Sequence, residues 1–258
     1  MMLIAFASLT FGISLAGFAC IALLPAARSP ATLVGLPFWL IMVWGPSLAA
    51  ILLSLRSDEL TPLLGRAVRI STVPTEVWGL VAAPLVLLMV MKLFAPQDPT
   101  SLRFGTAVLM VVFNLVLGPL GEELGWRGLM QEDLASHLGW LEASLLVGIV
   151  WFAWHLPLWT IDSPHAQVSL PLFAIHCLLY SIIIGAAYHI SGGSILPAIL
   201  LHLNFNLAAN WAVFAGYRDP DAWFSASALP YALIGVAAAV LVYLKTGESG
   251  LRWLQFSG

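Results

Sequence analysis

Charged residues are scarce in this chain. Asp, Glu, Lys and Arg make up 9% of its 258 residues, whereas hydrophobic residues make up 60%. The net charge is −3 and no basic patch is present, which argues against a nucleic-acid partner. Apolar runs of about 20 residues recur, and each could cross a ~30 Å hydrocarbon core. We therefore predict an all-α, polytopic membrane protein embedded in a lipid bilayer.

Cysteine and N-terminal basic residues are also scarce. Cys20 and Cys177 lie in apolar segments without metal-binding spacing, so we expect buried thiols. The start, Met-Met-Leu-Ile-Ala-Phe, has no basic residue before its apolar stretch. This pattern indicates a first spanning helix instead of a cleaved signal peptide.

About eight spanning helices are expected, in a single membrane domain over residues 1–258. Residues 57–75 resemble a helix lying in the interface, and residues 128–140 an amphipathic elbow between spans four and five. The distribution of Lys and Arg favours cytoplasmic termini, in the cell membrane if the protein is prokaryotic. The predicted spans are 2–25, 32–55, 76–95, 104–126, 141–159, 170–190, 194–213 and 226–246.

Two adjacent carboxylates end the fourth predicted span. Glu123 and Arg127 are four residues apart on a helix, with the glutamate first, which predicts an ion pair. Glu122 points elsewhere and has no cation one turn away. It is therefore a candidate general base or acid. The alternative is a hydrogen-bonded carboxyl group that joins two helices.

Two histidines lie deep in later apolar segments. Trp151 precedes His155 by one turn, so the indole can pack beside the imidazole. His202 and Asn206 share a helix face and can direct donors at one point, as an oxyanion site requires. The alternative is polar contact between helices. The remaining histidines are expected to be structural or solvated: His137, His165, His176 and His189.

Taken together, EExxxR, aromatic-xxx-His and His-xxx-Asn on three spans resemble the CPBP family. These intramembrane proteases are related to the type II CAAX prenyl endopeptidase (the Ras-converting enzyme) and to bacteriocin-processing and immunity proteins. The match runs from about Val112 to Asn210, with a catalytic core expected over residues 104–213; Trp151 stands where the family usually has phenylalanine. The resemblance implies water activation by Glu122 and His155, oxyanion stabilisation by His202 and Asn206, and support from Glu123, Arg127 and Trp151.

The resemblance also implies a substrate and leaves the cofactor open. The substrate would be a membrane-associated or lipidated peptide or protein, prenylated in the eukaryotic relatives. Glu122, His155 and His202 could form a zinc site with an open position, as in a metalloprotease. However, the chain has no HExxH helix, and a Glu–His pair can activate water without a metal. Metal-free hydrolysis is therefore the favoured interpretation.

A non-catalytic function remains the alternative. Immunity or partner-binding proteins and proton or ion relays could use the same polar cluster, although no inverted repeat is visible. The predicted depths of the site residues in the membrane are a difficulty for the protease hypothesis, because they differ from one helix to the next. If span five starts near Trp140, His155 lies ~22 Å along its helix, whereas His202 lies only ~12 Å along span seven. Glu122, at the end of span four, should be shallower still.

Overall fold

Helices provide all the regular secondary structure in the computed structural model, which describes residues 2–161 and 163–252. The all-α prediction is confirmed. The α-helices are α1 (Met2–Leu23), α2 (Gly35–Val43), α3 (Gly45–Arg56), α4 (Leu60–Ala67), α5 (Thr75–Met91), α6 (Phe104–Val116), α7 (Pro119–Gly125), α8 (Glu132–His137), α9 (Trp140–His155), α10 (Leu170–Ile190), α11 (Leu196–Trp211) and α12 (Pro220–Thr246). The short elements are η1 (Pro25–Ala27), η2 (Lys92–Phe94), the π-helix η3 (Trp126–Gln131), η4 (Leu156–Thr160) and η5 (Pro164–Gln167).

Within those ranges, six helical stretches are long and apolar enough to span a membrane, and a bent pair makes a seventh candidate. The bent pair is α2 and α3, which meet at 59° beside Pro46. The seventh expected span, residues 194–213, forms α11, whose 16 residues are shorter than a usual span. The chain is therefore an integral, multi-pass membrane protein.

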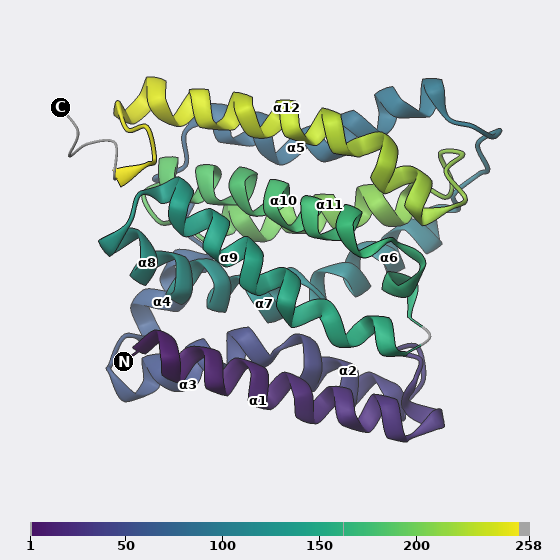
Figure 1. Cartoon of the computed structure of the whole chain (residues 1–258), viewed down its shortest axis with the longest axis horizontal. Helices are drawn as coiled ribbons and strands as arrows, with labels where there is room; N and C mark the ends of the chain where they lie inside the picture. The colour runs from purple at the N-terminus through teal and green to yellow at the C-terminus, as the bar shows by residue number, and fades with distance from the viewer. Residues whose placement is uncertain (1, 162, 253–258) are drawn as a thin grey trace.

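The helices lie roughly side by side in tiers (Figure 1). α1, α2 and α3 form one side, α5 and α12 form the opposite side, and the remaining long helices lie between them. α10 packs against both α9 and α12, while α11 packs against α5 and α3 packs against α7. The helices that carry the candidate site residues, α7, α9 and α11, are thus in the interior.

Residues 104–137 form one long, interrupted helical stretch. Gly118 breaks it between α6 and α7, and Pro119 then begins α7, where its missing N–H costs no hydrogen bond. The π-helix η3 joins α7 to α8, so the predicted elbow is largely helical and the chain turns only at residues 138–139. π-Helical turns inside α-helices often mark functional sites.

Glycines bring α7 close to its neighbours. A Cβ on Gly121 would lie 2.9 Å from the Val43 carbonyl oxygen, and one on Gly125 would lie 2.5 Å from that of Pro46. These distances leave no room for a side chain, so glycine is required at both positions. Small residues commonly allow helices to approach closely in membranes. The bent pair α2–α3 therefore fixes the position of the segment that carries Glu122 and Glu123.

The start of α1 and the end of α12 lie at the same end of the bundle, together with α4 and α8 (Figure 1). The interface helix predicted over residues 57–75 is shorter than expected: α4 covers Leu60–Ala67, and Leu63 is its buried residue. Cys177 is a buried free thiol as expected, whereas Cys20 is a free thiol that is only half-buried.

Candidate active site

Glu122 is buried and hydrogen-bonded to two tryptophans. Its Oε2 accepts the indole N–H of Trp151 at 2.6 Å and that of Trp126 at 3.2 Å. Trp126 lies one turn later on the same stretch, and Trp151 comes from α9. Both bonds fall on one oxygen, so the carboxylate is oriented by neutral donors from two elements while Oε1 keeps its acceptor capacity.

Glu123 has cationic or ionisable partners instead. Its Oε1 accepts from Arg127 Nη1 at 3.1 Å and lies 2.7 Å from His202 Nδ1. The predicted ion pair between Glu123 and Arg127 is therefore present, and both side chains are fully buried. Arg127 Nη2 also donates to Ser181 Oγ on α10, at 3.2 Å. A buried charge is tolerated when it is paired and hydrogen-bonded in this way.

Trp151 lies among the other site residues. Its ring centroid is 5.7 Å from that of His155 and 5.0 Å from that of His202, both edge-to-face. The Arg127 guanidinium carbon is 5.4 Å from the same ring centroid. The indole therefore touches both candidate imidazoles while its N–H bonds to Glu122.

A backbone contact sets the tautomer of His155. Nδ1 lies 2.8 Å from the Trp151 carbonyl oxygen, which can only accept a proton. In the neutral ring, Nδ1 is therefore the protonated nitrogen, and Nε2 carries the free lone pair. Such a nitrogen can take a proton from water.

Asn206 lies one turn beyond His202 on α11 and is half-buried. Its Nδ2 is 2.8 Å from the position that a Cβ on Gly118 would occupy. Among the described residues, no hydrogen bond involves its side chain; its backbone carbonyl accepts from Asn210 Nδ2 at 2.8 Å. The amide thus lies in the helix break before α7 with its donors uncommitted.

The depth difficulty disappears because span four does not end near Glu122. Glu122 precedes the end of α8 at His137 by 15 residues, and His155 follows the start of α9 at Trp140 by 15 residues. Both lie ~22 Å from the turn that joins these helices. α11 begins deeper in the bundle than that turn, since Ile195, just before its first residue, packs near Gly128 of the π-helix. The expectation of a shallow Glu122 was wrong.

A zinc site does not fit these residues. No group of three His, Cys, Asp or Glu side chains converges as a metal-ligand set within residues 2–161 and 163–252, and this includes Glu122, His155 and His202. One oxygen of Glu122 is already held by two indole donors. Such donors orient a carboxylate toward N–H groups and not toward a cation.

Comparisons with known proteins match the segment that contains these residues. A family model described as type II CAAX prenyl endopeptidase Rce1-like matches residues 104–208. Residues 104–208 are therefore similar to this family. The match contains all the candidate site residues and confirms the resemblance inferred from the sequence motifs. CAAX prenyl protease 2 of Methanococcus maripaludis is 31% identical over 156 residues, which are 58% of this chain. The chain spans 55% of that relative's length.

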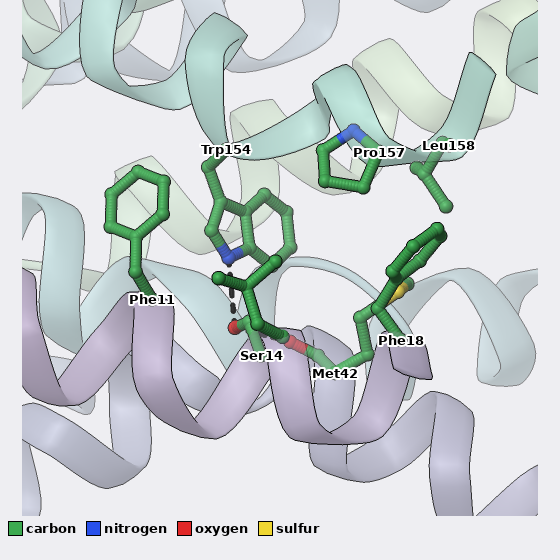
Figure 2. Close-up of a pocket in the computed structure, with 8 residues that line it drawn as sticks. Phe11, Ser14, Phe18, Met42, Trp154, Pro157 and Leu158 are labelled. Atoms are coloured by element: carbon green, nitrogen blue, oxygen red, sulfur yellow. Dashed lines mark hydrogen bonds between the residues drawn. The ribbon is translucent and has the colours of Figure 1, made fainter. Parts of the chain in front are cut away.

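An apolar pocket lies beside the candidate site, between α1, α2 and the end of α9. It encloses about 320 Å³ of empty space that includes open solvent. Figure 2 shows Trp154 on one wall, with its indole N–H bonded to Ser14 Oγ on α1 at 2.8 Å. The Trp154 ring lies 4.7 Å from that of His155, so one side chain separates this pocket from the site. The other lining residues are Phe11, Leu15, Phe18, Met42, Pro157 and Leu158.

Three residues that contact the candidate site were not identified from the sequence. Trp126 is four residues after Glu122, and this spacing could have identified it as a partner. Ser181 carries no such signal. His165 was expected to be structural or solvated, but its ring lies 5.6 Å from that of His155. Burial lowers the pKa of His165 to about 4, so it is uncharged at neutral pH.

Proposed function

We propose that this protein is an intramembrane endopeptidase that hydrolyses a peptide bond of a membrane-associated or lipidated protein. One observation carries the proposal. The indole of Trp151 bonds to Glu122 and also contacts His155 and His202. The Rce1-like match over residues 104–208 supports the same reaction. A relative named CAAX prenyl protease 2 makes a prenylated C-terminal peptide the first substrate to test.

Glu122 and His155 act on the attacking water. Oε1 of Glu122 accepts one proton of the water as the water oxygen bonds to the scissile carbonyl carbon, while Nε2 of His155 accepts a hydrogen bond from the same water. The carbonyl oxygen becomes a tetrahedral oxyanion. When the C–N bond breaks, the proton passes to the leaving amine, so that one water is consumed per bond cleaved.

His202 and Asn206 stabilise the oxyanion. Nδ1 of His202 donates to Glu123, so Nε2 donates to the oxyanion when the imidazole carries both protons. Nδ2 of Asn206 supplies a neutral second donor. Preorganised donors of this kind commonly contribute several kcal/mol to acyl transfer. Arg127 balances the charge of Glu123.

The site opens to the cytoplasm in this proposal, with both termini on that side. The basic residues at the ends of α3 and α12 and on α4 support this orientation: Arg56, Lys245 and Arg66. The Rce1-like stretch acts as the catalytic core within a single membrane domain.

Cleavage of a defined peptide tests the proposal. The protein is reconstituted in liposomes with a fluorogenic peptide that ends in a farnesylated C-a-a-X sequence, and peptides released from native membranes are compared by mass spectrometry. Glu122→Gln and His155→Ala should abolish cleavage. Asp133→Asn and His137→Ala change another acidic residue and another histidine, both on α8 and outside the site. These two variants should retain cleavage.

The outcomes separate the two functional hypotheses. Cleavage of another membrane peptide, but not the farnesylated one, would support the protease and reject the prenylated substrate. Full activity in Glu122→Gln would refute the mechanism. If the wild-type protein released no peptide from either source, the non-catalytic relay or partner-binding function would be the better account.

A further inference from the structure

The two glutamates of the site receive opposite kinds of hydrogen bonds. Glu123 Oε1 is shared by Arg127 and His202, which are cationic or can become so. Glu122 Oε2 is shared by two indoles, which are always neutral. Both tryptophans are buried, at 0% exposure for Trp126 and 4% for Trp151.

The neutral contacts have a chemical consequence. A carboxylate paired with a guanidinium is stabilised as an anion and is a poor base, whereas an isolated buried carboxylate is free to rotate. Indole donors hold one oxygen in place, and they stabilise the anion less than a guanidinium does because they add no net charge. Arg127 is close enough to lie 5.4 Å from the Trp151 ring centroid, yet its hydrogen bonds go to Glu123 and Ser181.

We propose that Trp151 and Trp126 are positioning residues that hold Glu122 Oε2 and direct Oε1 to the attacking water. This inference rests on the proposed function. Trp151 makes the shorter bond and comes from another helix, so it also fixes the distance between α7 and α9 at the site. The contribution of Trp126 is smaller, at 3.2 Å from within the same helical stretch.

Phenylalanine substitutions test the role of the indole N–H separately from that of the aromatic ring. Trp151→Phe keeps an aromatic ring between His155 and His202 but removes the donor. Trp126→Phe removes the donor of the longer bond and keeps an aromatic ring against Phe6, whose ring centroid lies 5.8 Å from that of Trp126. The matched control is Trp39→Phe on α2, which removes a buried indole bond to the Ala27 carbonyl oxygen at 3.2 Å, away from Glu122.

The first measurement is the pH dependence of kcat/KM on the farnesylated peptide in liposomes. Because hydrogen bonds to a carboxylate favour its ionised form, losing one should move the acid limb to higher pH. We expect a shift of about one pH unit for Trp151→Phe and less for Trp126→Phe, with none for Trp39→Phe. An acid limb in Trp151→Phe identical to that of Trp39→Phe would overturn the proposal.

The second measurement does not require turnover. The infrared carboxylate stretching band of Glu122 is assigned by its absence from Glu122→Gln. It should shift in Trp151→Phe and stay in place in Trp39→Phe, and an unshifted band would refute the positioning contact. If the band shifts but wild-type protein cleaves nothing, the hydrogen-bonding part stands while the proposed function fails.

Discussion

His202 Nδ1 lies 2.7 Å from Glu123 Oε1, and the same oxygen accepts from Arg127 at 3.1 Å. One buried carboxylate oxygen therefore connects α11 to the helical stretch that carries Glu122. The contact orients the His202 ring so that Nδ1 is engaged and Nε2 is left for a ligand. Loss of Glu123 should thus affect both stability and catalysis.

Glu123→Gln tests this connection. The substitution leaves the Arg127 guanidinium buried without a compensating charge, which is typically destabilising by about 3–5 kcal/mol. We expect a clearly lower melting temperature in detergent and a loss of peptidase activity. Asp133→Asn removes a carboxylate on α8, outside the site, and serves as the control. Equal melting temperatures for the two variants would contradict a structural role for Glu123.

Arg66 on α4 holds the π-helix in place. Its Nη2 donates to the Gly128 carbonyl oxygen at 2.6 Å, and its Nη1 contacts Glu132 and Tyr188, each at 3.1 Å. Arg66→Ala should speed amide hydrogen exchange over residues 126–131 and cost about 1–3 kcal/mol of stability. Arg56→Ala removes an exposed arginine at the end of α3 and is the control. Unchanged exchange in Arg66→Ala would show that the π-helix is stable without this contact.

Gly118 makes room for the Asn206 amide. A Cβ there would lie 2.8 Å from Asn206 Nδ2 and 2.8 Å from the Asn114 carbonyl oxygen. Gly118→Ala should therefore displace the amide and reduce kcat while KM changes little. The loss should approach the roughly 100- to 1,000-fold seen when an oxyanion donor is removed.

Gly105→Ala is the control for this substitution, because a Cβ on Gly105, in α6, would have no atom within 4 Å. The kcat and KM of both variants are measured on the farnesylated peptide. A kcat for Gly118→Ala equal to that of Gly105→Ala would argue against an oxyanion role for Asn206.

His165 should make stability depend on pH. Its pKa is about 4 in the folded protein, against about 6.5 when unfolded, because burial disfavours the charged ring. As the pH falls from 6.5 to 4, the unfolded state takes up a proton that the folded state does not. The stability contribution is therefore complete above pH 6.5 and decreases below it, by at most about 3–4 kcal/mol.

His165→Phe removes this titration and keeps an aromatic ring against Phe173. Melting temperatures measured from pH 7 to pH 4 should fall less steeply in the variant than in wild type. His137→Phe, at an exposed histidine on α8, should follow the wild-type slope. Identical slopes in all three proteins would place His165 in solvent.

Much of the helical pattern could be predicted from the chain itself. All eight expected spans are at least partly helical, because long apolar runs leave the backbone no other way to satisfy its hydrogen bonds in lipid. The end of span four was misplaced at residue 126. Gly125 and Gly128 resemble a helix end, but tertiary contacts keep this stretch helical through the π-turn, including the bond from Arg66 to the Gly128 carbonyl.

Within the site, contacts along a single helix were the predictable ones. The bond between Glu123 and Arg127 and the packing of Trp151 on His155 both follow from four-residue spacing. The contacts of Glu122 with Trp151, of Glu123 with His202 and of Arg127 with Ser181 join different helices. No spacing rule relates them.

The amino-acid order alone determined that this protein is helical and crosses the membrane, and it identified the acidic, imidazole and amide side chains available for chemistry. Only the tertiary structure decided that Glu122 and His155 lie at one depth and that an indole bonds to Glu122. The physical reason is that 3.6 residues per turn determine neighbours within a helix. The rotation and axial position of one helix against another are set by packing, here through the glycines of α7 and the π-helix.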